Sequence, residues 1–158
     1  MELSDEQRQI DFDESRRDLI ALLDGETDSI ARMSSVAAIL FARMPQLSFC
    51  GFYRVIAPTT LAVGPYQGPV GCLRIEFGRG VCGTAAAEAR AVLVEDVTKY
   101  PGHISCDPAA RSELVLPVRN RTGQLLAVLD LDSHEIAAFD RSDEKRLQKL
   151  LDELFASD

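Results

Sequence analysis

The stretch SELVLPVRNRTGQLLAVLDLDS, residues Ser112–Ser133, decides the fold, because two apolar strand patterns in it are separated by turn residues. Residues 112–118 and 124–132 are rich in Val and Leu and alternate over several positions, as residues of β-strands do. The Asn-Arg-Thr-Gly segment between them (120–123) has the composition of a tight turn. The stretch therefore predicts a β-hairpin.

The register of this hairpin predicts which side chains share a face. If all four residues of Asn-Arg-Thr-Gly form the turn, Arg119 faces Gln124 and Glu113 faces Asp130. Side chains alternate between the two faces of a sheet, so residues two apart lie on the same face. One face is then expected to carry Glu113, Val115, Pro117, Leu126, Val128, Asp130 and Asp132.

The carboxylates of Glu113, Asp130 and Asp132 are thereby predicted to cluster at one end of that face. Like charges across a ladder destabilise it, and crowded carboxylates raise one another's pKa. The simplest alternative is that the strand ends have reached solvent. The LDLD segment continues an apolar strand, which favours a binding role instead, with an amino-acid ammonium and a proton donor in the cluster. Ca²⁺ or Mg²⁺ ranks lower, because both need more oxygen ligands.

The segments around the hairpin complete an α+β pattern. Residues 13–24 have helical spacing, and residues 28–44 form a second amphipathic pattern that Pro45 ends. Short strands are expected at 47–56, 61–64, 72–77 and 91–97, a short helix at 84–89, and a last helix at 141–156 with Ser142 as N-cap. Helices packed on a mainly antiparallel sheet are the predicted architecture.

The chain is expected to form one domain over residues 1–158, with no repeat or linker. Glycine and proline are dense between 65 and 108, and such loops in a small domain favour ligand binding. The net charge of -8 and pI near 4.8 argue against nucleic acid and anionic membranes as partners. No apolar run approaches the roughly 20 residues of a membrane helix, and the polar N-terminus does not resemble a signal peptide, so a cytoplasmic location is expected.

Four cysteines occur in the chain, and their surroundings differ. Cys50 lies within an apolar strand pattern and is expected in the core. Cys72, Cys82 and Cys106 lie in or beside the glycine-rich segments, without the CxxC spacing of zinc ribbons or thioredoxin-type motifs. A Cys3His zinc site with His103 remains the less favoured alternative.

Cys106 has the local sequence of a reactive thiol. Asp107-Pro108 is typical of a helix start, and a helix N-terminus stabilises a thiolate. Arg111 would add to this effect and Asp107 would oppose it. Cys82 lies in a similar position before the short helix. A reactive thiol with a second cysteine in reach can pass through a sulfenic acid to a disulfide.

Three segments together carry a resemblance to a known family: FGRGVCGTAAAE (77–88), PGHISCDPAARSELVLPV (101–118) and VLDLDS (128–133). They resemble the free methionine-(R)-sulfoxide reductases, which are single GAF-domain enzymes, and the match extends over nearly the whole chain. The resemblance implies a six-stranded antiparallel sheet with helices packed against it. It also implies reduction of free L-methionine-(R)-S-oxide to methionine, and the R preference rests on the resemblance alone.

The resemblance also implies roles for the cysteines. Cys106 matches the nucleophile that attacks the sulfoxide sulfur and becomes a sulfenic acid. Cys72 matches the resolving cysteine, which forms a transient disulfide with Cys106. Cys82 matches a third cysteine, either an auxiliary thiol or an alternative disulfide partner. Thioredoxin would reduce the disulfide, and neither a bound cofactor nor a metal is implied. A homodimer is a further expectation.

The substrate-binding carboxylates of the family match Glu113, Asp130 and Asp132, the residues that the hairpin grouped. We expect Glu113 and Asp132 near the sulfoxide oxygen, where a carboxylic acid with a raised pKa would activate the sulfur, and Asp130 near the ammonium. The pocket tryptophan of the family is replaced by Phe49. Tyr53 and Tyr66 are further pocket candidates, and His103 is expected to hydrogen-bond within its loop.

Two alternatives from other functional classes remain open. A GAF sensor would bind a small ligand without turning it over, and it would consume no reductant. A redox-sensing module would use a disulfide between Cys72 and Cys106 to signal to a partner. A sensor would not need three cysteines at these positions, whereas the redox-sensing module shares the thiol chemistry of the reductase and differs only in its output.

Overall fold

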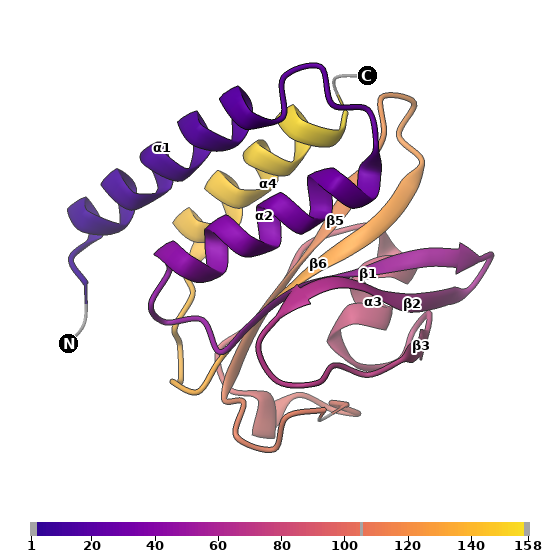
Figure 1. Ribbon diagram of the computed structural model, residues 1–158. Coiled ribbons are helices and arrows are strands. Elements are labelled where there is room, and N and C mark those ends of the chain that lie inside the picture. The colour runs from indigo at the N-terminus through magenta and orange to yellow at the C-terminus, as the bar shows by residue number, and fades with distance from the viewer. Residues whose placement is uncertain (1–2, 105, 157–158) are drawn as a thin grey trace.

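A computed structural model describes residues 3–104 and 106–156 and shows a six-stranded antiparallel sheet in the order β3-β2-β1-β6-β5-β4 (Figure 1). Both ends of the predicted domain, residues 1–2 and 157–158, lie outside this description. The strands are β1 (Phe49–Ala57), β2 (Thr60–Gln67), β3 (Arg74–Glu76), β4 (Val92–Val94), β5 (Ser112–Arg119) and β6 (Leu125–Ser133). The helices are α1 (Asp5–Leu22), α2 (Ser29–Arg43), α3 (Gly80–Glu88), the 3-10 helix η1 (Val97–Lys99) and α4 (Arg141–Phe155).

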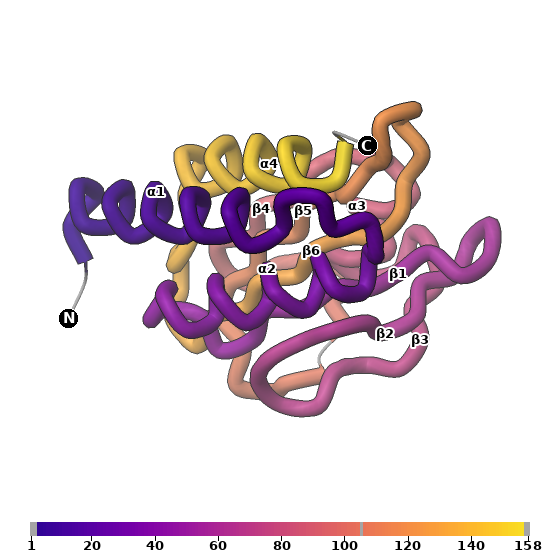
Figure 2. The backbone as a smooth tube through the Cα atoms, turned by 45° about the horizontal axis from the view of Figure 1, so that its top comes forward, coloured from indigo at the N-terminus to yellow at the C-terminus, as the bar shows by residue number. Residues whose placement is uncertain are grey.

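The helices divide between the two faces of the sheet. On one face α2 packs on β1 and β2, α4 packs on β5, and α1 lies outside them against both helices (Figures 1 and 2). On the other face α3 packs on β5 and β6. The predicted α+β architecture is confirmed. None of the helices among the described residues is long and apolar enough to cross a membrane.

The first residues of α1 and α4 are set by their capping side chains, and the structure differs from the prediction in the start of α1 and in the N-cap of α4. α1 begins at Asp5 because Ser4 caps it, and side-chain bonds from Gln7 to Asp11 support its polar first half, which has no apolar stripe. The predicted Ser142 cap of α4 is wrong. Asp140 is the N-cap, and it forms a capping box with Asp143.

The hairpin exists as predicted, but its register is shifted by two residues. Asn120 N–H donates to Gln124 O at 3.0 Å, which leaves a three-residue loop that ends at Gly123 with φ of 84°. A bulge after Val118 shifts the register by one further residue. Arg119 pairs with Leu125 and Val118 pairs with Ala127, so Leu126 between them has no partner in this ladder.

The shift moves the partner of Glu113 from Asp130 to Asp132. Because the total shift is even, Glu113, Asp130 and Asp132 still share the predicted face. Leu126 does not share it. It packs against the helix-covered core, whereas Leu125 packs against the opposite cluster.

Candidate active site

A pocket lies on the sheet face opposite to the α1–α2–α4 layer. Its floor is the end of β5 and β6 that carries the carboxylates, and α3 forms one wall. The segments that follow β2 and η1 form the mouth. The cavity volume is about 40 Å³, which suits a water molecule or an ion and not an amino acid. Its lining includes Phe49, Tyr53, Cys82, His103, Cys106, Glu113, Asp130 and Asp132.

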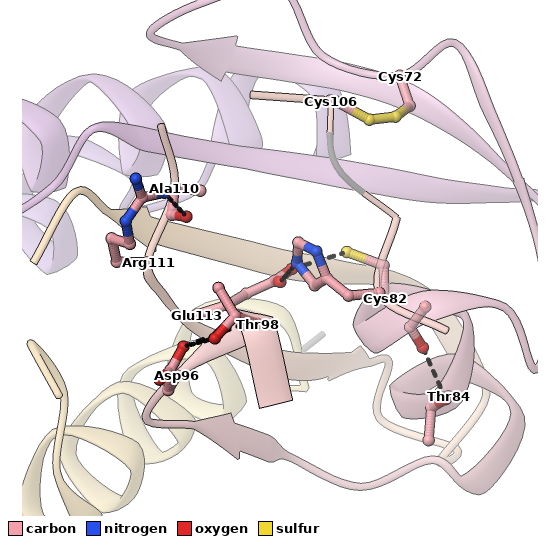
Figure 3. Close-up of polar contacts among 11 residues, drawn as sticks. Cys72, Cys82, Thr84, Asp96, Thr98, Cys106, Ala110, Arg111 and Glu113 are labelled. Carbon is pink, nitrogen blue, oxygen red and sulfur yellow. Dashed lines mark hydrogen bonds and ion pairs between the residues drawn. A yellow bond between two sulfur atoms is a disulfide. The ribbon is translucent and has the colours of Figure 1, made fainter. Parts of the chain in front are cut away.

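A disulfide between Cys72 and Cys106 crosses the mouth of this pocket (Figure 3). Cys72 belongs to the segment between β2 and β3, and Cys106 to the segment between η1 and β5. Their Cα atoms lie 5.7 Å apart although 34 positions separate them in sequence. The residue of Cys106 is exposed and that of Cys72 is partly buried, so the bond lies at the surface of the molecule. The two mouth segments are therefore held together in this oxidised form.

The turn after Cys106 differs from the predicted helix start. Asp107 Oδ1 accepts a hydrogen bond from Ala109 N–H at 3.0 Å, and Ala110 N–H donates to Asp107 O at 3.1 Å. The chain then enters the sheet, where Arg111 N–H donates to Ser133 O. A single turn results, because β5 begins at once and leaves no room for a helix. A helix dipole therefore cannot be the source of thiolate stabilisation at Cys106.

Glu113 and Asp130 are buried and Asp132 is partly buried, and among the described residues no ion pair joins any of the three to Lys or Arg. Burial raises the pKa of Glu113 well above its usual range, and the charge of Asp132 adds to this effect. Burial and Glu113 raise the pKa of Asp130 in the same way. Asp132 is partly buried, and desolvation followed by the charge of Asp130 raises its pKa. The floor therefore retains protons at pH values where exposed carboxyls are ionised.

His103 contacts this floor directly, with Nε2 3.1 Å from Glu113 Oε2. The backbone turn in which His103 N–H donates to Tyr100 O directs the ring inward. Burial lowers the pKa of His103 and favours the neutral ring. The prediction of a hydrogen bond within its own loop missed this role. One feature of the sequence could have indicated this contact: His103 lies three residues before Cys106, so both side chains belong to the same mouth segment.

Cys82 lies in the first turn of α3, whereas the sequence placed it before the helix. Its Sγ is 3.9 Å from Glu113 Oε1, and Figure 3 shows the two side chains pointing toward one another. Burial raises the pKa of the Cys82 thiol, and the charges of Asp130 and Glu113 raise it further. Cys82 is therefore a buried neutral thiol below the disulfide. The disulfide joins Cys72 and Cys106, the two cysteines of the mouth segments.

The aromatic side chains form the wall beside β1. The Phe49 ring stacks on Tyr66 with centroids 5.4 Å apart and on Tyr53 at 6.4 Å, each with 21° between the ring planes. Gly51 permits this packing, since a Cβ there would lie 2.9 Å from the Phe49 ring. Phe49 and Tyr53 line the pocket, whereas Tyr66 lies behind Phe49. Cys50, which points to the opposite face, is fully buried in the core, as predicted.

The fold and this geometry agree with what known proteins show. A GAF domain model matches residues 18–155. A free methionine-R-sulfoxide reductase of Escherichia coli is 42% identical over 138 residues, which cover 87% of this chain and 82% of that protein. This chain belongs to the free methionine-R-sulfoxide reductase family of GAF-domain proteins.

Two further members of the family support the assignment. The free methionine-R-sulfoxide reductase of Saccharomyces cerevisiae is 39% identical, and the match covers 82% of this chain and 75% of that protein. The crystal structure of a free methionine-R-sulfoxide reductase of Neisseria meningitidis, in complex with its substrate, superposes with a TM-score of 0.88 at 37% identity. That superposition covers 98% of this chain and 90% of the other. The family resemblance expected from the cysteine and LDLDS segments is thus confirmed.

Proposed function

We propose that this chain reduces free L-methionine-(R)-S-oxide to L-methionine by thiol chemistry. The observation that carries the proposal is the disulfide between Cys72 and Cys106 at the mouth of a pocket whose floor holds Glu113, Asp130 and Asp132. The relatives from Escherichia coli and Saccharomyces cerevisiae are free methionine-R-sulfoxide reductases, and the reductase of Neisseria meningitidis was crystallised with its substrate.

The first step assigns Cys106 as nucleophile. Its sulfur attacks the sulfoxide sulfur, the S–O bond of the substrate breaks as the oxygen passes to the Cys106 sulfur, and methionine leaves while Cys106 becomes a sulfenic acid. The sulfoxide is reduced by two electrons, and the thiol sulfur is oxidised by two. Because the leaving oxygen needs a proton, the pocket must supply an acid near it. Glu113 and Asp132 are suited to this role, since burial and the charges of neighbouring carboxylates raise the pKa of each.

The remaining carboxylate is suited to binding the substrate ammonium. Asp130 Oδ1 is buried and, among the residues that the structure describes, has no hydrogen-bond partner. An ammonium group would provide hydrogen bonds and a compensating charge there. This contact would restrict the enzyme to the free amino acid, because a residue within a peptide has no ammonium. Phe49 and Tyr53 would hold the methyl and methylene groups.

His103 is a positioning residue for Glu113 in this scheme. The neutral ring and the protonated carboxyl can share one proton across the 3.1 Å contact, which fixes the orientation of Glu113. The ring can also return a proton after turnover, since it lies at the mouth side of the pocket. This role explains why a histidine of low exposure stands beside a buried carboxylate.

The second and third steps complete the cycle. The Cys72 thiol attacks the Cys106 sulfenic acid, the disulfide forms and water leaves. Thioredoxin or a similar dithiol then reduces the disulfide, so that the sum is sulfoxide plus dithiol giving sulfide, water and disulfide. The cavity of the oxidised form, about 40 Å³, is smaller than the substrate, which fits a state that follows chemistry. Such a cycle also suits the cytoplasm, where thiols are kept reduced.

The decisive experiment follows NADPH consumption with thioredoxin and thioredoxin reductase. We expect turnover with free L-methionine-R-sulfoxide and much less with the S epimer or with a sulfoxide-containing peptide. Equal rates with the peptide would contradict the ammonium contact. Binding of the sulfoxide without NADPH consumption would instead indicate the sensor function. The expected homodimer is checked by light scattering of the same preparation.

A further inference from the structure

Three side chains from different elements converge below the disulfide. Cys82 comes from α3, Glu113 from β5 and Asp130 from β6. The sulfur of Cys82 and one oxygen of each carboxylate all lie within 4.8 Å of one another, and each residue is only 5% exposed. Cys82 Sγ and Glu113 Oε1 are 3.9 Å apart. These groups are potential metal ligands, and their separations of up to 4.8 Å would have to shorten for one ion to contact all three.

Among the described residues, no ion pair joins Glu113 or Asp130 to a Lys or Arg side chain, although Arg79 also lines the pocket. In addition, Asp130 Oδ1 is a buried oxygen without a hydrogen-bond partner among the described residues. A cation at the centre would compensate the charges of these carboxylates and give this oxygen a partner.

We propose that Cys82, Glu113 and Asp130 form a binding site for a thiophilic divalent cation, and that Zn²⁺ is the ion they fit. Zn²⁺ accepts sulfur and carboxylate ligands in tetrahedral geometry, in which sulfur and oxygen ligands would be about 3.6 Å apart. The observed 3.9 Å needs only a small adjustment. Ca²⁺ and Mg²⁺ require six or more oxygen ligands and do not fit.

The surroundings also suit a metal with one open position. His103 Nε2 contacts the second oxygen of Glu113, which leaves Oε1 directed to Cys82, and such partners commonly orient metal ligands. The cavity of about 40 Å³ has room for the ion and a water molecule as fourth ligand. On binding, the Cys82 thiol and the carboxyl groups that still hold a proton release their protons to the solvent as the sulfur–metal and oxygen–metal bonds form, with no change of oxidation state.

A regulatory consequence follows, and it rests on the proposed function. Glu113 and Asp130 are the groups assigned there to the sulfoxide oxygen and the ammonium of the substrate. The metal and the substrate therefore exclude one another, and Zn²⁺ inhibits competitively. The sulfoxide reductase activity would then fall as the concentration of free Zn²⁺ rises.

The test uses the full chain with Cys72→Ser and Cys106→Ser, which removes the thiols of the mouth. Zn²⁺ is titrated in competition with a chromophoric chelator, and Co²⁺ is used in parallel for its sulfur-to-metal charge-transfer absorption. We expect one equivalent of Zn²⁺ per chain and the cobalt band. Adding Cys82→Ser should weaken Zn²⁺ binding by about 100-fold or more, since a direct ligand matters at least as much as its supporting partners.

Control variants in the same background identify the site. Cys50→Ala removes the other remaining thiol, on the far face of the sheet, and should leave both signals unchanged. Cys82→Ala and Asp130→Asn should each weaken binding, and circular dichroism checks that each variant is folded. The inference is overturned if Zn²⁺ binds folded Cys82→Ser and Cys82→Ala as tightly as the parent, or if the parent binds no stoichiometric Zn²⁺.

The substrate arm separates this inference from the proposed function. Free methionine sulfoxide should raise the apparent Kd for Zn²⁺ in proportion to its own concentration. Tight Zn²⁺ binding through Cys82 that ignores the sulfoxide would support the metal site and contradict the assignment of the carboxylates to the substrate. Normal sulfoxide reduction with no Zn²⁺ binding would overturn the metal site alone.

Discussion

The two faces of the central sheet use the same strands for opposite purposes. Toward α2 and α4, strands β5 and β6 present Leu114, Leu116, Leu129 and Leu131, all fully buried in one apolar core. The intervening positions face α3 and the mouth segments, and they carry the carboxylates. One face thus gains stability from apolar burial, whereas the other holds acidic groups whose pKa values are raised by burial. Because successive side chains of a strand point to opposite faces, neighbouring residues of β5 and β6 can serve the apolar core and the acidic site.

The largest expected effect is on turnover at the mouth of the site face. Cys106→Ser should abolish sulfoxide reduction, because serine cannot form the sulfenic acid or the disulfide. The matched change on the helix-covered face, Cys50→Ala, should keep full activity per folded molecule and lower stability. The NADPH-coupled assay and urea denaturation of both variants check this. Full activity of Cys106→Ser would exclude it as the nucleophile.

The next effect concerns the acid in the floor. Glu113→Gln should lower the rate of sulfenic acid formation by about 10²-fold, since the amide cannot transfer a proton. The measurement is single-turnover methionine release. Glu135→Gln, an exposed change just after β6, serves as the control and should leave the rate unaltered. A rate for Glu113→Gln within twofold of the parent would move the acid role to Asp132.

The helix-covered face should respond through stability instead. Leu129→Ala removes a fully buried side chain from that core and should lower the free energy of unfolding by about 2–5 kcal/mol. Urea denaturation measures the change. The kcat of the remaining folded enzyme should stay close to that of the parent. A loss below about 1 kcal/mol would show that the core repacks easily at this position.

The dependence of stability on pH should distinguish the faces further. Because the folded pKa of Asp130 lies above the unfolded value, the folded state keeps a proton that the unfolded state releases. Stability is therefore greatest below about pH 4 for this group and declines as pH rises toward the folded pKa, by up to about 1.4 kcal/mol per pH unit and proton. Asp130→Asn should flatten this decline in urea denaturation series. An unchanged slope would mean that Asp130 is ionised in the folded protein.

The smallest effect is expected at the positioning residue. His103→Ala should lower kcat about tenfold and shift the alkaline limb of the kcat profile, because Glu113 loses its partner. His103→Gln, which keeps a donor group, should recover part of the loss. The control is His134→Gln, since His134 contacts Asp107 outside the floor. Equal kcat profiles for His103→Ala and the parent would contradict the role.

Much of this molecule was predictable from periodicity. The turn residues and alternation of the hairpin predicted its two strands and placed Glu113, Asp130 and Asp132 on one face. The exact partners were wrong, because a three-residue loop and a bulge at Leu126 each moved the register by one residue. Neither feature has a strong local signal, but their sum is even, so the shared face survived.

Other parts of the site depended on contacts between distant segments. The sequence indicated a thiol site at Cys106 through a helix start that does not form, because the chain turns once and enters β5. It also placed His103 in its loop, whereas the backbone turn at Tyr100 directs the ring to Glu113. Local propensity carries no information about which side chain a turn brings to which strand.

By itself, the sequence determined the α+β class, the apolar face and the acidic face of the hairpin, and the resemblance of its cysteine segments to the reductase family. These follow from periodicity and residue type, which are local properties. Only the tertiary structure decided that Cys82 and His103 both reach Glu113, and that the disulfide spans the mouth above them. Those contacts join elements far apart in the chain, and their geometry is set by the packing of α3 and the mouth segments on the sheet.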